Sequence, residues 1–406
     1  MPTKDELKLL QALPLDLKVR RTEQRIKEWV DEYGTDGVYI SFSGGKDSTV
    51  LLDIVRNRLG YADIPAVFIN TGLEYPEIVK FVQSKDNVVM LKPSMNFKQV
   101  LKKYGYPFIS KEVAEAVYGA RKYLKAIEEN TPPRYAQFYR KINGSGEYAR
   151  GGKSQSTDAK SKKSSGLGVV ADRLRANEMN QRLALLTGKF WEWKSDRSAG
   201  SGLNKGMVRG EMPIMDRSMF SCEKYKFFLD ADFEISNKCC FIMKKQPAHK
   251  YAKETGRRPI TAQMAGESRL RMQRWLNNGC NGFDMKEPIS NPMSFWTEQD
   301  VLRYIKENDL EICSVYGEVV ATDDEGFEYF NPIGEQKLQT TGCERTGCIY
   351  CGFGCHLEKG EGRFERLKKT HPKQYEWIMK PESEGGLGYK HIIDWINEHG
   401  NLHIKY

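Results

Sequence analysis

Apolar residues follow two different spacings along the first ninety residues, and these spacings predict helices that alternate with strands. Residues 5–33 carry aliphatic side chains among charges at helical spacing, which predicts one or two helices. Further helices are expected at 48–58 and from about residue 75. Short apolar runs predict strands at 38–42, 66–70 and 88–91. Because strands and helices that alternate in this way form parallel sheets with right-handed crossovers, we expect an α/β, Rossmann-like fold.

The apolar pattern is lost between residues 121 and 210, where glycine, serine and basic residues dominate. Residues 140–175 hold nine Lys or Arg against three Asp or Glu, and few aliphatic residues precede Leu167. This composition predicts a flexible basic insertion with helical pieces around 170–187. The insertion would be an electrostatic arm for nucleic acid or a solvated linker without a partner, and the sequence does not decide between them.

The core-like pattern returns near residue 215. It predicts helices at 223–229, 238–254 and 362–379 and a strand at 259–262. A further helix is expected to begin after Thr297, with Asp300 completing a capping-box arrangement. We expect a nucleotide-binding domain whose N-terminal half (1–120) and remainder (211–295) flank the insertion (121–210), followed by a helical, cysteine-rich C-terminal domain (296–406).

Composition narrows the class of protein. The 406 residues are 39% hydrophobic, which is enough for packed cores, and the net charge of +9 suits a nucleotide or nucleic-acid partner. No apolar run is long enough to span a membrane, and the N-terminus lacks the apolar stretch of a signal peptide. We expect a cytoplasmic protein with no membrane partner, in which nine cysteines serve metal or redox chemistry rather than disulfides.

A glycine-rich turn after the first predicted strand is the main candidate site. It reads Ser43-Gly44-Gly45-Lys46-Asp47-Ser48 and runs into a predicted helix, so that its backbone N–H groups and the helix dipole favour an anion such as a phosphate. Lys46 adds a mobile charge, and the spacing differs from that of a Walker A loop. Thr71 and Gly72 follow the second strand and are expected at the same sheet edge.

Charged residues near this turn have more than one interpretation. Asp47 would bind Mg²⁺, orient the loop, or only stabilise the start of the helix. Arg269 and Arg271 would clamp a phosphate or sulfate group, or form ordinary surface ion pairs on a helix. Glu77 is expected to be a first-turn charge rather than a catalytic base. Three further basic residues are weaker candidates to line the site, namely Lys111, Arg257 and Arg258.

Four thiols lie within thirteen residues as Cys343-x4-Cys348-x2-Cys351-x3-Cys355, and Cys239-Cys240 forms a second pair. Glycines between the four allow a short loop to wrap a metal. The spacing suits tetrahedral zinc held by the local four, or an iron–sulfur cluster that draws on both segments. The remaining thiols are expected to be buried and inert: Cys222, Cys280 and Cys313.

Several of these motifs resemble those of known enzymes. SGGKDS after a strand is similar to the PP-loop of the ATP pyrophosphatase (adenine nucleotide alpha-hydrolase-like) superfamily, whose members cleave ATP between the α- and β-phosphates. Cys239-Cys240 with Lys244 and Pro247, and Gly347-Cys348-x2-Cys351, resemble the CC…K…P and GCxxC segments of adenylylsulfate reductases. Residues 70–77 and 266–271 resemble two more segments of that family. The chain is therefore expected to belong to the phosphoadenosine phosphosulfate (PAPS) reductase family over about 36–120 and 215–356.

The resemblance implies cofactors and ligands. In that family the double cysteine and the CxxC hold a [4Fe–4S] cluster, which here implies ligation by Cys239, Cys240, Cys348 and Cys351. A competing set uses Cys343, Cys348 and Cys351 with Cys240 or Cys355, and structural zinc is a third possibility. ATP or an adenylyl sulfonucleotide is expected at residues 43–48, with Mg²⁺, and Lys46, Asp47, Arg269 and Arg271 are the expected catalytic residues.

The chain also departs from the reductases. Those enzymes attack the sulfate with a cysteine near the C-terminus, whereas no cysteine follows Cys355 here. SGGKDS is typical of ATP-cleaving members. The combination resembles DNA phosphorothioation enzymes and iron–sulfur tRNA thiolases, which implies adenylylation-dependent sulfur transfer to DNA, RNA or a nucleotide, with a sulfur donor such as a cysteine desulfurase. The alternatives are a true PAPS or adenylylsulfate reductase that uses Cys343 or Cys355, and a nucleic-acid-binding accessory protein with a structural cluster.

Overall fold

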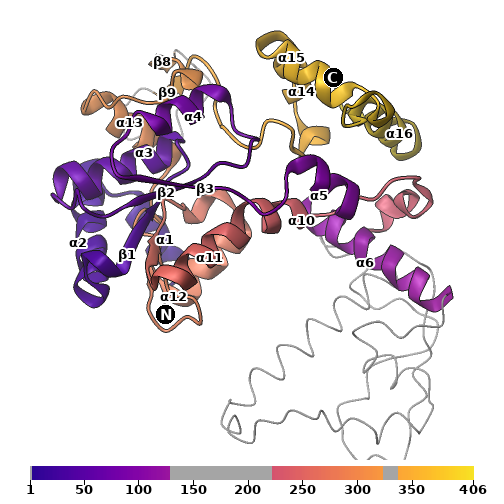
Figure 1. The fold of residues 1–406 in the computed structure, drawn as a ribbon. Coiled ribbons are helices and arrows are strands. Elements are labelled where there is room, and N and C mark those ends of the chain that lie inside the picture. Colours follow the sequence, from indigo (N-terminus) through magenta and orange to yellow (C-terminus); the bar gives the residue numbers. More distant parts are fainter. Residues whose placement is uncertain (1, 129–221, 323–336) are drawn as a thin grey trace, which may run out of the picture. The chain divides into compact units, whose positions relative to one another are not determined.

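The computed structural model describes residues 2–128, 222–322 and 337–406. The chain forms two compact units, each built from separate stretches of sequence. Residues 1–100 and 239–350 form the first unit, and residues 101–238 and 351–406 form the second. Two helices contain the boundaries, α5 (Phe97–Tyr104) and α10 (Lys238–Cys240). Figure 1 shows the described elements coloured along the sequence.

A six-stranded sheet is the centre of the first unit. Its order is β3-β2-β1-β5-β7-β6, and every neighbouring pair is parallel except β7 and β6. The strands are β1 (Val38–Ser41), β2 (Ala66–Ile69), β3 (Val88–Leu91), β5 (Arg258–Ile260), β6 (Asn281–Gly282) and β7 (Ile289–Ser290). The expected α/β fold with a mainly parallel, Rossmann-type sheet is confirmed.

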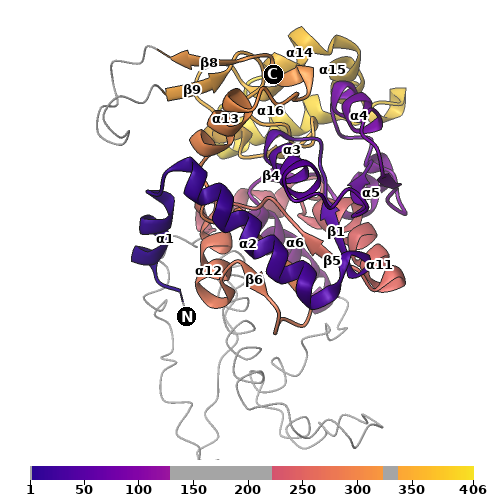
Figure 2. The same ribbon diagram turned by 90° about the vertical axis from the view of Figure 1, so that its left-hand side faces the viewer.

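Helices before and between these strands bury apolar faces against the sheet. Figure 2 shows α2 (Leu15–Tyr33) crossing in front of the sheet, where Ile26 and Trp29 pack with Ile40 and Phe68 in one core. The other helices of the unit are α1 (Lys4–Gln11), α3 (Lys46–Asp53), α4 (Pro76–Gln83), α11 (Gln246–Thr255), α12 (Arg269–Asn278) and α13 (Glu298–Glu307).

Most predicted elements of the first unit are present. The strands expected at 38–42, 66–70 and 88–91 are β1, β2 and β3, and Thr297 and Asp300 form the expected capping box at the start of α13. Two expected helices each contain a π-helical stretch: α3 continues as Ile54–Arg58, and Phe241–Lys245 joins α10 to α11. A hairpin of β8 (Val319–Thr322) and β9 (Lys337–Thr340) follows α13.

The second unit contains a two-stranded parallel sheet surrounded by helices. Its strands are β4 (Phe108–Ile109) and β10 (Gly352–Phe353), and a side chain at Gly352 would lie 2.5 Å from the Phe108 ring. The Tyr389 ring packs against Phe108 and Phe364, at centroid distances of 5.3 and 5.9 Å. The helices are α6 (Lys111–Glu128), α14 (Arg363–Thr370), α15 (Pro372–Met379) and α16 (Tyr389–Gly400), with a 3-10 helix at Glu223–Asp230.

The two units divide the chain at places other than the predicted domain boundaries. Residues 296–350, which we expected in a separate C-terminal domain, belong to the first unit, because α13 packs Val301 and Tyr304 into the same core as Val50 of α3. Most of the predicted insertion, including the helical pieces at 170–187, lies outside the described residues. In the described ranges, no helix has the length and apolar character that crossing a membrane requires.

Candidate functional site

The strand order defines where a ligand would bind in the first unit. From β1 the chain proceeds outward to β2 and β3, and the later strands β5 and β7 lie on the opposite side of β1. In open parallel sheets, ligands bind at the carboxyl ends of the strands where the order reverses. Here this point lies between the turn after β1, residues 42–45, and the segment after β5, which begins at Thr261.

Gly44 gives the turn after β1 its shape. Its φ of +70° is in the left-handed region, and a Cβ there would lie 2.8 Å from Val82 and 2.9 Å from Ile78 of α4. Glycine is therefore required for both conformation and space. Gly45 is the N-cap of α3 and provides no side-chain cap, so the first turn of that helix keeps N–H donors for another acceptor.

The two serines of the turn hold its backbone. The Ser48 hydroxyl donates to the Gly45 carbonyl over 2.9 Å, and the Ser43 N–H donates to Ser48 Oγ over 3.2 Å. The two hydroxyls are 3.0 Å apart. Because the loop closes on itself through these bonds, its N–H groups are held in one arrangement before any ligand binds.

Lys46 is buried and bonded to groups far away in the sequence. Its side chain is 5% exposed, and Nζ donates to Glu298 Oε1 over 2.7 Å and to the Glu344 carbonyl over 2.5 Å. Its backbone N–H donates to the Tyr316 hydroxyl over 3.3 Å. The same hydroxyl is 2.5 Å from Thr346 Oγ1. The structure thus adds Glu298, Tyr316 and residues 344–346 to the predicted site.

Asp47 lies among charged side chains. Burial raises the pKa of its carboxyl above the usual value, Lys46 opposes this effect, and Glu298 adds to it, while Arg345 and Arg271 also lower the pKa. Among the described residues, no donor reaches Asp47 Oδ1. A carboxylate oxygen that is buried without a donor suits a cation as its partner, so the side chain fits the predicted Mg²⁺ role.

The predicted arginines lie at the start of α12, whose N-cap Ser268 accepts from the Arg271 N–H over 3.3 Å. Arg271 is ion-paired with Glu267; burial lowers its guanidinium pKa, and the charge of Asp47 raises it. Arg271 is therefore within electrostatic reach of the loop. Arg269 is exposed at the first position of the helix.

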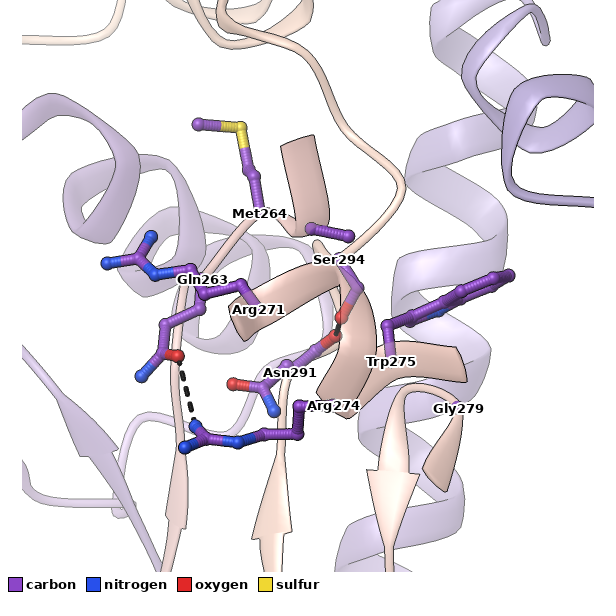
Figure 3. Close-up of a pocket in the computed structure, with 9 residues that line it drawn as sticks. Gln263, Met264, Arg271, Arg274, Trp275, Gly279, Asn291 and Ser294 are labelled. Atoms are coloured by element: carbon purple, nitrogen blue, oxygen red, sulfur yellow. Dashed lines mark hydrogen bonds between the residues drawn. The ribbon is translucent and has the colours of Figure 1, made fainter. Parts of the chain in front are cut away.

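A small pocket adjoins α12 on the β5 and β7 side of the reversal point. Figure 3 shows the side chains of Arg271, Arg274 and Gln263 together there, with Arg274 donating to Gln263 Oε1 over 3.4 Å. Asn291 and Ser294 also line the pocket. None of Gln263, Arg274, Asn291 and Ser294 was predicted; Gln263 follows β5, Arg274 lies one turn after Arg271 in α12, and the pairing of β5 with β7 brings Asn291 and Ser294 to this edge.

The turn after β2 links the predicted nucleotide and cysteine regions. Thr71 donates through its N–H and hydroxyl to the Glu74 carboxylate, over 3.0 and 2.7 Å. The Leu73 carbonyl accepts from the Ile349 N–H over 2.8 Å, which fixes the residue after Cys348 beside this turn. Thr71 and Gly72 therefore lie at the sheet edge, as predicted from the parallel strands, but Thr71 is bonded within its own turn.

Three of the four predicted cluster ligands belong to the first unit. The Sγ atoms of Cys239 and Cys240 are 4.0 Å apart. Partial burial lowers the pKa of Lys244, but the charges of Cys348, Glu74 and Cys240 more than offset this effect, so the pKa lies above its usual value. Cys240 and Cys348 are thus close to one ammonium group. Cysteine sulfurs are soft donors of the kind that hold a cluster or zinc.

The fourth predicted ligand, Cys351, belongs to the second unit as the first residue of its C-terminal segment, and its carbonyl accepts from Arg363 over 2.7 Å. Over the described parts of the chain, no group of three or more His, Cys, Asp or Glu side chains is already arranged to hold a metal ion. Ligation by these four cysteines therefore stays a prediction.

The other cysteines of the motif are buried. Burial raises the pKa of Cys355 to about 12, so its thiol is protonated at neutral pH. Cys343 donates through Sγ to the Arg345 carbonyl over 2.9 Å. The Cys355 environment therefore does not favour a thiolate nucleophile. None of the nine cysteines, all of which lie in the described ranges, forms a disulfide.

Comparison with known proteins identifies the family. Residues 37–131 and 219–352 match the phosphoadenosine phosphosulfate reductase domain. Because this match covers more than half of the chain, the protein belongs to the phosphoadenosine phosphosulfate reductase domain family. The predicted family membership is thereby confirmed.

Individual relatives are more distant. Over 117 residues the chain is 33% identical to an uncharacterised protein, MJ0066, of Methanocaldococcus jannaschii, and this stretch is 28% of the chain and 22% of that protein. A crystal structure of PAPS reductase from Candida auris in complex with phosphate aligns with 77% of the chain and 91% of its own length, at 12% identity and a TM-score of 0.32. Similarity at that level is too low to transfer site residues.

Proposed function

We propose that this protein cleaves ATP between the α- and β-phosphates and uses the activated intermediate for sulfur transfer to a nucleic acid or nucleotide. One observation carries the proposal. Within the first unit, the turn after β2 is bonded to the residue after Cys348, and it leaves the sheet at the edge that holds the Lys46 loop. A loop suited to bind phosphate and three of the proposed cysteine ligands therefore belong to one structural unit.

The chain's own residues would activate the acceptor. Lys46 and the first-turn N–H groups of α3 would bind the phosphates, and Arg271 would neutralise charge on the departing pyrophosphate. Asp47 would hold Mg²⁺ on the phosphate oxygens. An acceptor oxygen then attacks the α-phosphorus while the bond to pyrophosphate breaks, which leaves the acceptor carrying AMP. Hydrosulfide, released from the persulfide of a donor protein such as a cysteine desulfurase by a thiol reductant, attacks the activated acceptor, and AMP leaves with the acceptor oxygen.

Cys239, Cys240, Cys348 and Cys351 would hold a [4Fe–4S] cluster. Such a cluster supplies a site where sulfur binds as a ligand before transfer. Lys244 would compensate the negative charge of the cysteine sulfurs, as it compensates Cys348 and Cys240 here. This reaction resembles that of DNA phosphorothioation enzymes and iron–sulfur tRNA thiolases. Burial raises the pKa of the Cys355 thiol, which disfavours Cys355 as the nucleophile of the reductase alternative.

The acceptor and the class of reaction are tested together. The protein is incubated with labelled ATP alone, with duplex DNA and with tRNA, and separately with PAPS and reduced thioredoxin. Release of AMP that is stimulated by one polynucleotide supports the proposal and names the acceptor class. Sulfite release from PAPS without ATP cleavage would instead identify a reductase. No turnover in any arm would point to an accessory protein.

A further inference from the structure

In this structure two donors of the loop that would bind phosphate, the side-chain ammonium and the backbone N–H of Lys46, are already bonded to other parts of the chain. Lys46 Nζ is bonded to the Glu298 carboxylate and the Glu344 carbonyl, which lie 252 and 298 residues further along. The Lys46 N–H, one of the first-turn donors, is bonded to Tyr316. A nucleotide that binds here must therefore displace partners that the chain itself supplies.

Of the groups bonded to Lys46, the Glu298 carboxylate is the one that a phosphate can displace. Its side chain is 41% exposed, whereas the Lys46 side chain is 5% exposed. The carboxylate can rotate into water at little cost, but the ammonium group cannot leave the loop without losing its burial. Displacement of Glu298 by a phosphate exchanges one anion for another around the same cation.

The fold also holds the Glu298 carboxylate in position to bind Lys46 again when the phosphate leaves. Glu298 is the first residue of α13, where the helix dipole favours a negative charge. The start of α13 is fixed by the Thr297–Asp300 capping box, and Asp300 is bonded to the buried Lys18 over 2.7 Å through both oxygens. The position of Glu298 opposite Lys46 is therefore set by the fold.

Negative charge at the loop opposes the binding of Glu298 and a nucleotide phosphate to Lys46 at the same time. Glu298 Oε1 lies 2.7 Å from Lys46 Nζ, and Asp47 is the next residue of the loop, so two carboxylates already share this part of the site. A nucleotide phosphate would add further negative charge beside both carboxylates. We propose that Glu298 is an internal competitor of the nucleotide, a carboxylate that takes the place of a phosphate on Lys46 until the nucleotide displaces it. This inference rests on the proposed nucleotide function of the loop.

The competition has a measurable consequence. If a fraction of the protein is closed by Glu298, the apparent affinity for nucleotide is reduced by that fraction. Glu298→Gln keeps the shape of the side chain and removes the charge. Since a partly exposed ion pair contributes modestly, we expect α,β-methylene-ATP to bind about three- to tenfold more tightly to this variant. Damage to the fold would weaken binding instead.

Isothermal titration with α,β-methylene-ATP, with and without Mg²⁺, compares the wild type, Glu298→Gln, Glu298→Ala and the matched control Glu307→Gln. Glu307 is exposed at the other end of α13, so its substitution should leave the affinity unchanged. Tighter binding to both Glu298 variants in both conditions supports the inference. Equal or weaker binding to them, with normal binding to wild type, overturns it; weakening confined to the Mg²⁺ arm would make Glu298 a metal ligand instead. If no variant binds, the proposed function itself fails.

Discussion

At the residue scale, Lys46 determines what the turn after β1 is able to bind. Its ammonium group is buried and bonded to a carboxylate and a carbonyl, and its N–H begins α3. A buried cation beside helix N–H donors attracts an anion more strongly than an exposed lysine does, because water screens it less. Gly44 permits this arrangement, since any side chain there would collide with α4.

Replacement of Lys46 should therefore weaken nucleotide binding without unfolding the protein. For Lys46→Ala we expect the dissociation constant of α,β-methylene-ATP to rise by about tenfold or more, as for loss of a charge-assisted hydrogen bond. The measurement is isothermal titration, with thermal unfolding to confirm folding. Lys80→Ala removes an exposed lysine of α4 and is the control; a similar loss there would show that net charge, not the loop, governs binding.

Replacement of Asp47 should make the protein more stable and less active. Burial raises the pKa of Asp47, so between its ordinary value and the raised one the native state holds the proton more tightly than the unfolded chain does. Stability from this group is lost as pH rises through that window, and the carboxylate destabilises the fold at neutral pH. Asp47→Asn should stabilise the protein at pH 7.5 by about 1 kcal/mol and abolish ATP cleavage.

Urea unfolding at pH 4 and pH 7.5 measures this effect. The difference between Asp47→Asn and wild type should be larger at pH 7.5 than at pH 4, because the raised pKa of Asp47 lets the native wild type carry more of the neutral form at the lower pH. A variant that is less stable than wild type at pH 7.5 would contradict the assigned desolvation. Such a result would mean that the charged carboxylate contributes a favourable contact in the folded state.

The local half of the site was predictable from the sequence, and the distant half was not. Gly44, Lys46 and Asp47 follow from one rule, that a strand, a glycine turn and a helix together make an anion site. Glu298, Tyr316 and Arg345 come from segments that follow the loop by more than 250 residues. No local pattern marks these residues, because only the packing of α13 and the 314–317 turn brings them to Lys46.

At the element scale, α13 is the helix that positions the site. Its capping box was visible in the sequence, but the buried ion pair between Lys18 of α2 and Asp300 was not. The side chains of this pair are 3% and 8% exposed, so neither charge is solvated by water. The pair therefore joins α2 to the start of α13 and, through Glu298, to the nucleotide loop.

Removal of one member of this pair should be strongly destabilising. For Lys18→Met we expect a loss of about 3–5 kcal/mol in the free energy of unfolding, because Asp300 stays buried without its cation. Urea denaturation measures the loss, and Lys18→Met with Asp300→Asn should recover part of it. Lys8→Met breaks an exposed pair with Asp5 and should cost below about 0.5 kcal/mol. Equal effects of Lys8→Met and Lys18→Met would contradict the account.

Elements with a clear hydrophobic period were predictable from the sequence, and elements too short to show a period were not. The four-residue strands β1, β2 and β3 and the amphipathic α2 were predicted from periodicity. The two-residue strands β4, β6, β7 and β10 were not, because so few residues show no period. The strand expected at 259–262 is β5, but the segment after it, which borders the pocket in Figure 3, was not assigned to the predicted edge.

At the scale of the whole molecule, the division into two units crosses the predicted boundaries. The nucleotide-binding domain was predicted in two parts, 1–120 and 211–295, but the first unit also takes in residues 296–350, and residues 351–406 join 101–238 in the second unit. Composition marks linkers, but it carries no information on which distant segments share a core. The cysteine motif is an example, since Cys348 belongs to the first unit and Cys351 to the second.

The cysteine proposal predicts the metal content of the purified protein. Anaerobic preparations should contain about four iron atoms per chain and broad visible absorption, as expected for one [4Fe–4S] cluster. Cys348→Ala should lose both, whereas Cys280→Ala, a cysteine outside the proposed set, should keep them. Stoichiometric zinc without iron in the wild type would replace the cluster by a structural zinc site.

The central claim is that the loop at residues 43–48 directs ATP cleavage to the bond between the α- and β-phosphates. The most direct measurement is separation of the products of ATP labelled at the α-phosphate, in the presence of the stimulating polynucleotide. The account predicts labelled AMP together with unlabelled pyrophosphate from wild type. Lys46→Ala should form no labelled AMP, and Lys80→Ala should form normal amounts of it. Labelled ADP with free phosphate, or AMP formation that survives Lys46→Ala, would contradict it.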